Sequence, residues 1–142
     1  MPTFEDLDGL ARAMPEADAR LSTTGRPDYS VKGKSFLLLR PPRKDAIDPD
    51  TGEPMDDVLV FRTQGQAGKS RWLDDPTLPL FTTPHFDGWP AVLMRVRHLD
   101  AADAASLREL VTHAWAAQAP KALVKAYLAR RDAVDPHSQR ES

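Results

Sequence analysis

The sequence contains no cysteine among its 142 residues. This absence excludes disulfide bonds, zinc sites built on thiolates and cysteine nucleophiles, and it is typical of a protein of the reducing cytoplasm. Long apolar stretches are also missing, since no run approaches the roughly 20 residues of a membrane-spanning helix. The first ten residues, MPTFEDLDGL, lack the basic flank and the apolar core of a secretory signal. We therefore expect a cytoplasmic protein that does not cross a membrane.

A general excess of positive charge is missing as well, because the formal net charge is −2. The charges are unevenly distributed along the chain. From Arg20 to Lys44 there are seven basic residues and one acid, whereas residues 45–57 contain six acids and no base. A binding surface for an anionic partner is therefore expected from one region of the chain and not from the whole surface.

Motifs for metal-dependent or triad catalysis are absent too. The four histidines are scattered, and neither a His-Glu-x-x-His motif nor a Gly-x-Ser-x-Gly elbow occurs. We therefore expect no metal site, no catalytic residue and no cofactor. His113 lies one residue away from the apolar helix face that contains Leu110 and Trp115, so we predict that it lies on the helix surface.

The length and composition favour one domain. With 41% hydrophobic and 28% charged residues, the chain resembles an average soluble protein, and a single core of this size is common. We assign the domain to residues 1–132 and expect a frayed tail over residues 133–142. Residues 40–57 include four prolines and show no apolar period, which predicts an exposed acidic loop within the domain. We expect residues 45–53 to be dispensable for folding.

Apolar periodicity predicts three helices and several short strands. The helices are expected over residues 4–14, capped by Thr3, over residues 101–118, capped by Asp100, and over residues 121–131. Alternating or β-rich runs predict strands over residues 20–24, 28–31, 35–40, 58–63 and 91–97. This order lacks the alternation of strands and helices that builds a parallel sheet. The sequence therefore predicts an α+β fold, an antiparallel sheet with an N-terminal helix and two C-terminal helices packed on one face.

The stretch VLVFRTQGQAGKSRWL, residues 58–73, resembles a strand followed by a phosphate-binding loop that ends in Gly-Lys-Ser. A phosphate loop requires a glycine where this sequence has Thr63, and Gly65 would shorten the loop by two residues. Only a helical stub is expected before Pro76. We therefore interpret the stretch as a polar connection and expect no tight binding of ATP or GTP.

A second crowded stretch is FTTPHFDGWPAV, residues 81–92. His85 and Asp87 could in principle act as acid and base, and an enzyme that uses them is the hypothesis we rank last. Asp87-Gly88 favours a tight hairpin turn instead. Trp89 is predicted to pack near the end of the sheet, because large aromatic residues dominate apolar cores.

The order of motifs resembles the MmcQ/YjbR family of small bacterial proteins, which are often described as proposed DNA-binding proteins with a double-wing motif. The matching pieces are the helix end at Met14-Pro15-Glu16, YSVKGKSFLLL (29–39), VLVF (58–61), FTTPHFDGWPAVLM (81–94) and THAWAAQAPKAL (112–123). The resemblance implies a compact α+β fold similar to the frataxin-like fold, and it implies no established enzyme activity. The acidic insertion after Arg40, and Pro90, depart from the usual pattern.

The leading hypothesis is a monomer that binds DNA weakly through phosphates and with little sequence preference. The resemblance places Lys32, Lys34 and Lys121 at recurring basic positions of the family. The full set of predicted nucleic-acid-binding residues is Lys32, Lys34, Arg40, Arg43, Lys44, Lys69, Arg71 and Lys121. The alternative is a non-catalytic protein-interaction module whose partner binds the sheet or the acidic loop. The few aromatic residues among the basic ones favour this alternative over single-strand binding.

Overall fold

The computed structural model describes the backbone of residues 2–141 and the side chains of residues 2–131. The side chains of the expected frayed tail, residues 133–142, lie outside this part. The elements follow the chain in the order α1 (Phe4–Arg12), β1 (Ala17–Leu21), β2 (Pro27–Val31), β3 (Lys34–Leu39), β4 (Val58–Arg62), α2 (Gly65–Leu73), the 3-10 helix η1 (Pro84–Phe86), β5 (Ala91–Arg95), the 3-10 helix η2 (Val96–Ala101), α3 (Ala104–Gln118) and α4 (Lys121–Glu141).

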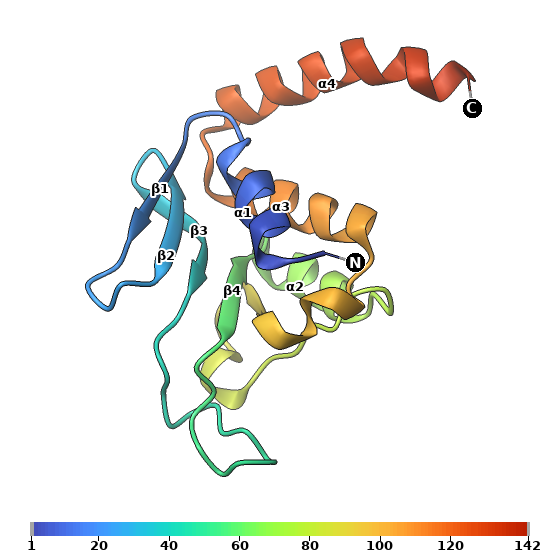
Figure 1. Cartoon of the computed structure of the whole chain (residues 1–142). Coiled ribbons are helices and arrows are strands. Elements are labelled where there is room, and N and C mark those ends of the chain that lie inside the picture. Colours follow the sequence, from blue (N-terminus) through green and yellow to red (C-terminus); the bar gives the residue numbers. More distant parts are fainter. Residues whose placement is uncertain (1, 142) are drawn as a thin grey trace.

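The five strands form one antiparallel sheet in which spatial order follows chain order, from β1 to β5. Antiparallel neighbours need only short connections, and the turns at residues 22–26 and 32–33 supply them. The register between β2 and β3 shifts at Tyr29 and Ser30, and Phe36 and Leu37 are both fully buried beside this irregularity. Helices α1 and α3 cover one face of the sheet, while α4 extends away at one end (Figure 1). The predicted α+β fold is confirmed.

Helix α1 begins as the sequence predicts. The Thr3 hydroxyl accepts the Asp6 N–H at 3.2 Å, and the Asp6 carboxylate accepts the Thr3 N–H at 2.9 Å. The N-cap predicted for α3 is wrong: Asp103, not Asp100, accepts the Ser106 N–H at 2.9 Å. Residues 96–101 form η2 instead, because Ala102 takes an extended conformation that separates the two helices.

Helix α2 is longer than the sequence predicts, because only a stub before Pro76 was expected within a polar connection and the helix has nine residues. Gly65 turns the chain out of β4 with a φ of 71°, a conformation that glycine adopts without strain. The N-cap Gln64 makes no capping hydrogen bond, so local signals for a helix are weak. Trp72 is 7% exposed and packs into the core, which indicates that tertiary contacts hold this helix.

The core lies between the sheet and the helices. Its largest fully buried side chains include Leu7, Tyr29, Phe36, Phe61, Leu107, Leu110 and Trp115. A smaller cluster covers the opposite, outer face of the sheet over β4 and β5, and consists of Val58, Val60, Phe86, Ala91 and Leu93. Leu38 of β3, which is partly buried, packs against this cluster. Within the described part of the chain, no helix is both long and apolar enough to cross a membrane.

The sequence predicts that residues 40–57 form an exposed acidic loop, but parts of this segment are buried. Asp48 is only 4% exposed and accepts from Arg95 Nη1 at 2.9 Å, while Asp57 accepts from Arg95 Nε at 2.8 Å. Ala46 is buried as well. Two carboxylates of the segment therefore bind the buried guanidinium of Arg95 in β5. The sequence could not reveal this contact, because the segment has no apolar period that would predict its attachment to the sheet.

Candidate functional site

Three of the predicted basic residues lie at one end of the sheet. Lys32, in the turn between β2 and β3, and Lys34, the first residue of β3, are both exposed. Lys121 is the first residue of α4. The Gln118 side-chain amide donates to the Ser35 carbonyl at 2.9 Å, which holds the end of α3 against the start of β3.

Lys125, which is exposed one turn after Lys121, joins them, since residues four apart share a helix face. We call Lys32, Lys34, Lys121 and Lys125 the lysine end. Sequence reasoning missed Lys125, although its spacing from Lys121 is the signal that could have identified it.

The remaining predicted basic residues do not join the lysine end. Arg43 and Lys44 are exposed, but they follow the opposite end of β3. A strand of this length spans roughly 20 Å, at about 3.4 Å per residue. Arg71 lies on α2. The predicted set therefore divides among separate parts of the molecule.

Arg40 is buried, with 5% of its surface exposed. Its Nη2 donates to Asp45 at 2.7 Å, and its guanidinium lies 5.1 Å from the centre of the Phe86 ring. This hydrogen bond holds the pKa of the Asp45 carboxyl below its usual range. Nη1 of Arg40 has no hydrogen-bond partner among the described residues. A role in contacting DNA phosphates on the surface is not favoured by this burial.

Lys69 is also buried, with 5% of its surface exposed. Its ammonium group donates to the main-chain carbonyls of Phe86 and, at 2.9 Å, of Trp89. The lysine of the Gly-Lys-Ser stretch thus points inward from the middle of α2 and supports the segment before β5. No loop of amides that could surround a phosphate is present here, because the residues are helical.

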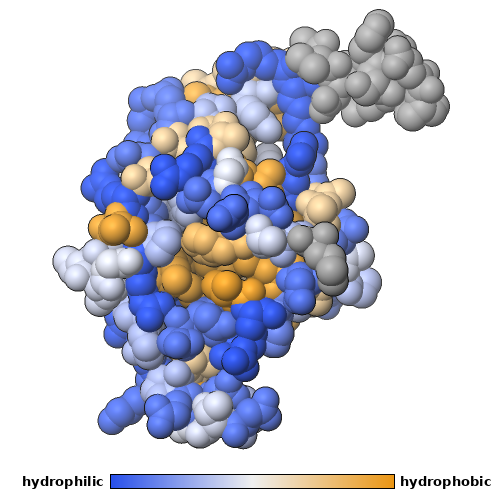
Figure 2. All heavy atoms as spheres, viewed as in Figure 1, coloured by the Kyte–Doolittle hydropathy of each residue, from blue (hydrophilic) through white to orange (hydrophobic). Residues whose placement is uncertain are grey.

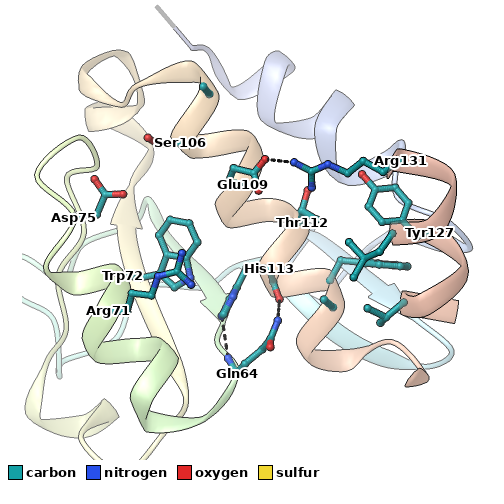
Figure 3. A pocket seen from close by; sticks show the side chains of 15 residues that line it. Gln64, Arg71, Trp72, Asp75, Ser106, Glu109, Thr112, His113, Tyr127 and Arg131 are labelled. Carbon is teal, nitrogen blue, oxygen red and sulfur yellow. Dashed lines mark hydrogen bonds and ion pairs between the residues drawn. The ribbon is translucent and has the colours of Figure 1, made fainter. Parts of the chain in front are cut away.

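A pocket of about 530 Å³ lies among α2, α3 and α4, and we call it the helix pocket. Figure 3 shows Arg71 and Trp72 of α2 facing His113 of α3, with Tyr127 and Arg131 of α4 on the other side. The ion pair between Arg131 and Glu109, at 2.6 Å, connects α4 to α3. The hydroxyl of Ser106 accepts from Thr77 at 2.7 Å. Many polar groups of the helix pocket are therefore engaged with the protein itself.

His113 is half-buried, which corrects the prediction of a surface histidine. Its Nε2 accepts the Gln64 N–H at 3.0 Å, and its ring meets Trp72 edge-on at 5.5 Å between ring centres. Burial, with a smaller contribution from the charge of Arg71, lowers the pKa of His113 to about 4. A neutral imidazole that accepts a main-chain hydrogen bond serves to fix the start of α2 on α3.

A second cavity, of about 500 Å³, lies on the outer face of the sheet, and we call it the outer groove. Leu38 and Val60 of the sheet, together with Phe86, provide apolar walls. Arg40, Arg43, Asp28, His85, Trp89 and the turn residues 22–24 provide polar or aromatic walls. Trp89 lies near the end of the sheet, two residues before β5, as the sequence predicts, but 54% of its surface is exposed, so it is not the packing residue that was expected.

His85 and Asp87 do not form a catalytic pair in the described part of the chain. Both are exposed, and no hydrogen bond joins them. Residues 84–86 form η1, and the Asp87 N–H donates to the Pro84 carbonyl at 3.2 Å. The hairpin turn predicted at Asp87-Gly88 is therefore replaced by a 3-10 helix. Among the described residues no group of three acidic, histidine or cysteine side chains could hold a metal ion.

Comparison with known proteins identifies relatives over almost the whole chain. The sequence model of the YjbR family matches residues 12–117. The proteins Rv2570 and MT2646 of Mycobacterium tuberculosis and Mb2600 of Mycobacterium bovis are each 37% identical over 134 residues, which is 91% of this chain and 98% of each relative. All three are named uncharacterized proteins. No solved structure is significantly similar to the chain.

Proposed function

The chain belongs to the YjbR family, and from this premise we propose that it binds nucleic acid weakly, through phosphate contacts made by the lysine end. The observation that carries the proposal is the placement of four exposed lysines on two neighbouring segments, the turn between β2 and β3 and the first turns of α4. Lysine ammonium groups on flexible stems reach phosphates without a fixed geometry. Such contacts give affinity but carry no direct sequence information.

The turn presents its two lysines on opposite sides of a glycine. Lys32 adopts a φ of 51° and Gly33 a φ of 82°, so the backbone reverses tightly between the strands. Lys32 forms an ion pair with Glu16, in which the two side chains are 54% and 51% exposed. Pairs this exposed are weak and screened by solvent. A phosphate can therefore compete with Glu16 for Lys32.

Arg40 and Lys69 are left out of the proposed interface because their charged groups are buried and bonded internally. Arg43 and Lys44 are left out because acidic residues follow them directly and because they lie at the other end of β3. Arg71 belongs to the helix pocket. The proposed interface is thus smaller than the set expected from the sequence, which supports weak rather than tight binding.

Fluorescence anisotropy with labelled duplex DNA at several salt concentrations tests the proposal. If about three phosphates are contacted, the slope of log affinity against log salt should be about −3, with dissociation constants of roughly 10⁻⁴ to 10⁻⁶ M at physiological salt. Replacing both turn lysines, Lys32→Gln with Lys34→Gln, should make the slope shallower by about 1 to 2. A control pair, Lys44→Gln with Arg108→Gln, removes the same charge from exposed positions outside the lysine end.

Two results would contradict the proposal. The first is the absence of binding by the unmodified protein even at low salt. The second is an equal loss of affinity in the control pair, which would mean that only net charge matters and that the lysine end is not the interface.

A protein-interaction module is the second candidate. Figure 2 shows hydrophobic residues gathered in the middle of this face, beside β4 and below α1. Apolar patches of this kind often mark surfaces for protein partners. An absence of DNA binding at low salt would make this candidate the better one.

A further inference from the structure

We propose that the outer groove binds a small molecule that combines a flat aromatic ring with one anionic group, such as a nucleoside monophosphate or an aromatic carboxylate. The proposal does not depend on DNA binding, because the outer groove and the lysine end share no residue. A cavity of about 500 Å³ is within the usual size range of small-molecule sites.

The aromatic half of the ligand is inferred from the shape and chemistry of the walls. Leu38 and Val60 supply a flat apolar floor from the sheet, and Phe86 closes one side. Trp89 stands at the rim with 54% of its surface exposed, so much of its indole is open to a ligand in the groove. The guanidinium of Arg62 lies 5.6 Å from the ring centre of Trp89 and restrains it. A planar ring could stack beside this restrained indole.

The segment that carries Trp89 is held in place from behind. The buried ammonium group of Lys69 donates to the carbonyls of Phe86 and Trp89, which flank the segment. The ring of Phe86 also meets Trp89 edge-on at 6.4 Å between ring centres. These contacts prearrange the aromatic side of the groove, so a ligand need not order it on binding.

The anionic half of the ligand is inferred from Arg40. This residue lines the groove, is 5% exposed, and uses Nη2 for Asp45 while Nη1 has no partner among the described residues. Nη1 is closed to solvent, so a carboxylate or phosphate oxygen would reach it only after a small shift of the Arg40 side chain. A buried guanidinium nitrogen without an acceptor is costly, and satisfying it would favour that shift.

Arg43 adds a second guanidinium at the rim. The groove also contains the carboxylate of Asp28, which accepts from the Ser35 hydroxyl at 2.7 Å. The groove thus contains the cations Arg40 and Arg43 and the anion Asp28, and Asp45 lies beside Arg40. This small excess of positive charge favours a ligand with one anionic group over a polyanion.

The test uses the indole N–H signals of the full-length protein in a ¹⁵N-correlated NMR spectrum. The chain has three tryptophans, and Trp72 and Trp115 are 7% and 0% exposed. The signal that disappears in Trp89→Leu identifies Trp89. The probes are adenosine monophosphate, indole-3-acetate, and adenosine as a ring without an anion. We expect both anionic probes to shift the Trp89 signal saturably, and adenosine to bind about tenfold more weakly.

Matched variants locate the anionic contact. Arg43→Gln should weaken adenosine monophosphate binding by about tenfold and leave adenosine binding nearly unchanged. Lys44→Gln, which removes the neighbouring charge outside the groove, should change neither. The proposal is overturned if neither anionic probe moves the Trp89 signal at millimolar concentration, or if the ligands move the Trp72 signal instead, which would place them in the helix pocket. Equal effects of Arg43→Gln and Lys44→Gln would also overturn it.

Discussion

At the scale of single residues, the buried ammonium group of Lys69 supports the segment that carries Trp89. Replacing Lys69 with methionine keeps the volume but leaves two carbonyls without a donor. We expect Lys69→Met to lower the free energy of unfolding by about 2 kcal/mol, because hydrogen bonds to charged groups are worth roughly 1.5 to 3 kcal/mol. Urea denaturation measures the change. Lys44→Met, at an exposed position, is the control and should stay within about 0.5 kcal/mol.

His113 gives the protein a defined dependence of stability on pH. Its folded-state pKa of about 4 lies below the ordinary value of 6.5, so the folded protein keeps the neutral ring while the unfolded chain takes up a proton. Stability from this group is therefore present above about pH 6.5 and is lost as the pH falls toward 4. Between pH 7 and pH 5 we expect the free energy of unfolding to fall by about 2 kcal/mol.

Urea denaturation at the two pH values measures this dependence, and His113→Gln should remove most of it. The carboxylates of Asp45 and Asp48 have lowered pKa values, so their contributions are lost only below this window. A pH dependence that is unchanged in His113→Gln would show that another group is responsible.

At the scale of elements, the acidic segment between β3 and β4 is attached to the sheet through Asp48. Its carboxylate receives hydrogen bonds from Arg95 and from the Asp50 N–H, at 2.9 and 2.8 Å. We expect Asp48→Asn to lower the midpoint of thermal unfolding by several degrees, because the buried guanidinium of Arg95 loses one of its two carboxylate partners and keeps Asp57. Circular dichroism measures the midpoint.

Asp50→Asn is the matched control, since Asp50 is exposed in the same segment. The same contacts revise the expectation that residues 45–53 can be replaced by a short Gly-Ser link without effect. Loop-closure entropy changes slowly with length, as that expectation assumed, but the replacement would also remove Asp48. Equal midpoints for the unmodified protein and for Asp48→Asn would restore the original expectation.

At the scale of the whole molecule, one core contains residues from all of the long elements. Its buried or partly buried members come from α1, α2, α3, α4 and every strand. We therefore expect a single cooperative unfolding transition, in which far-ultraviolet circular dichroism and tryptophan fluorescence coincide in urea. Separate transitions for the two signals would show that part of the chain unfolds independently.

The sequence by itself determined the fold class and much of the element order. Short turns join β1 to β2 and β2 to β3, and antiparallel pairing of these strands follows directly from such connections. The Thr3 cap and the apolar spacing of Leu7 and Ala11 are local signals that act within one helix. The exposed turn lysines, Lys32 and Lys34, could be identified for the same reason, because nothing distant in the sequence covers them.

Only the tertiary structure decided which charged and aromatic side chains are available to a partner. Arg40 and Lys69 resemble surface cations in the sequence, but Asp45 and the carbonyls of Phe86 and Trp89 bind them in the interior. Asp45 is only five residues from Arg40, but Phe86 contacts both cations from a distant segment, and no local period encodes that contact. Trp89 is the reverse case, since its hydrophobicity predicts burial but its side chain is exposed at the rim of the outer groove. Phe86, and not Trp89, occupies the apolar site over β4.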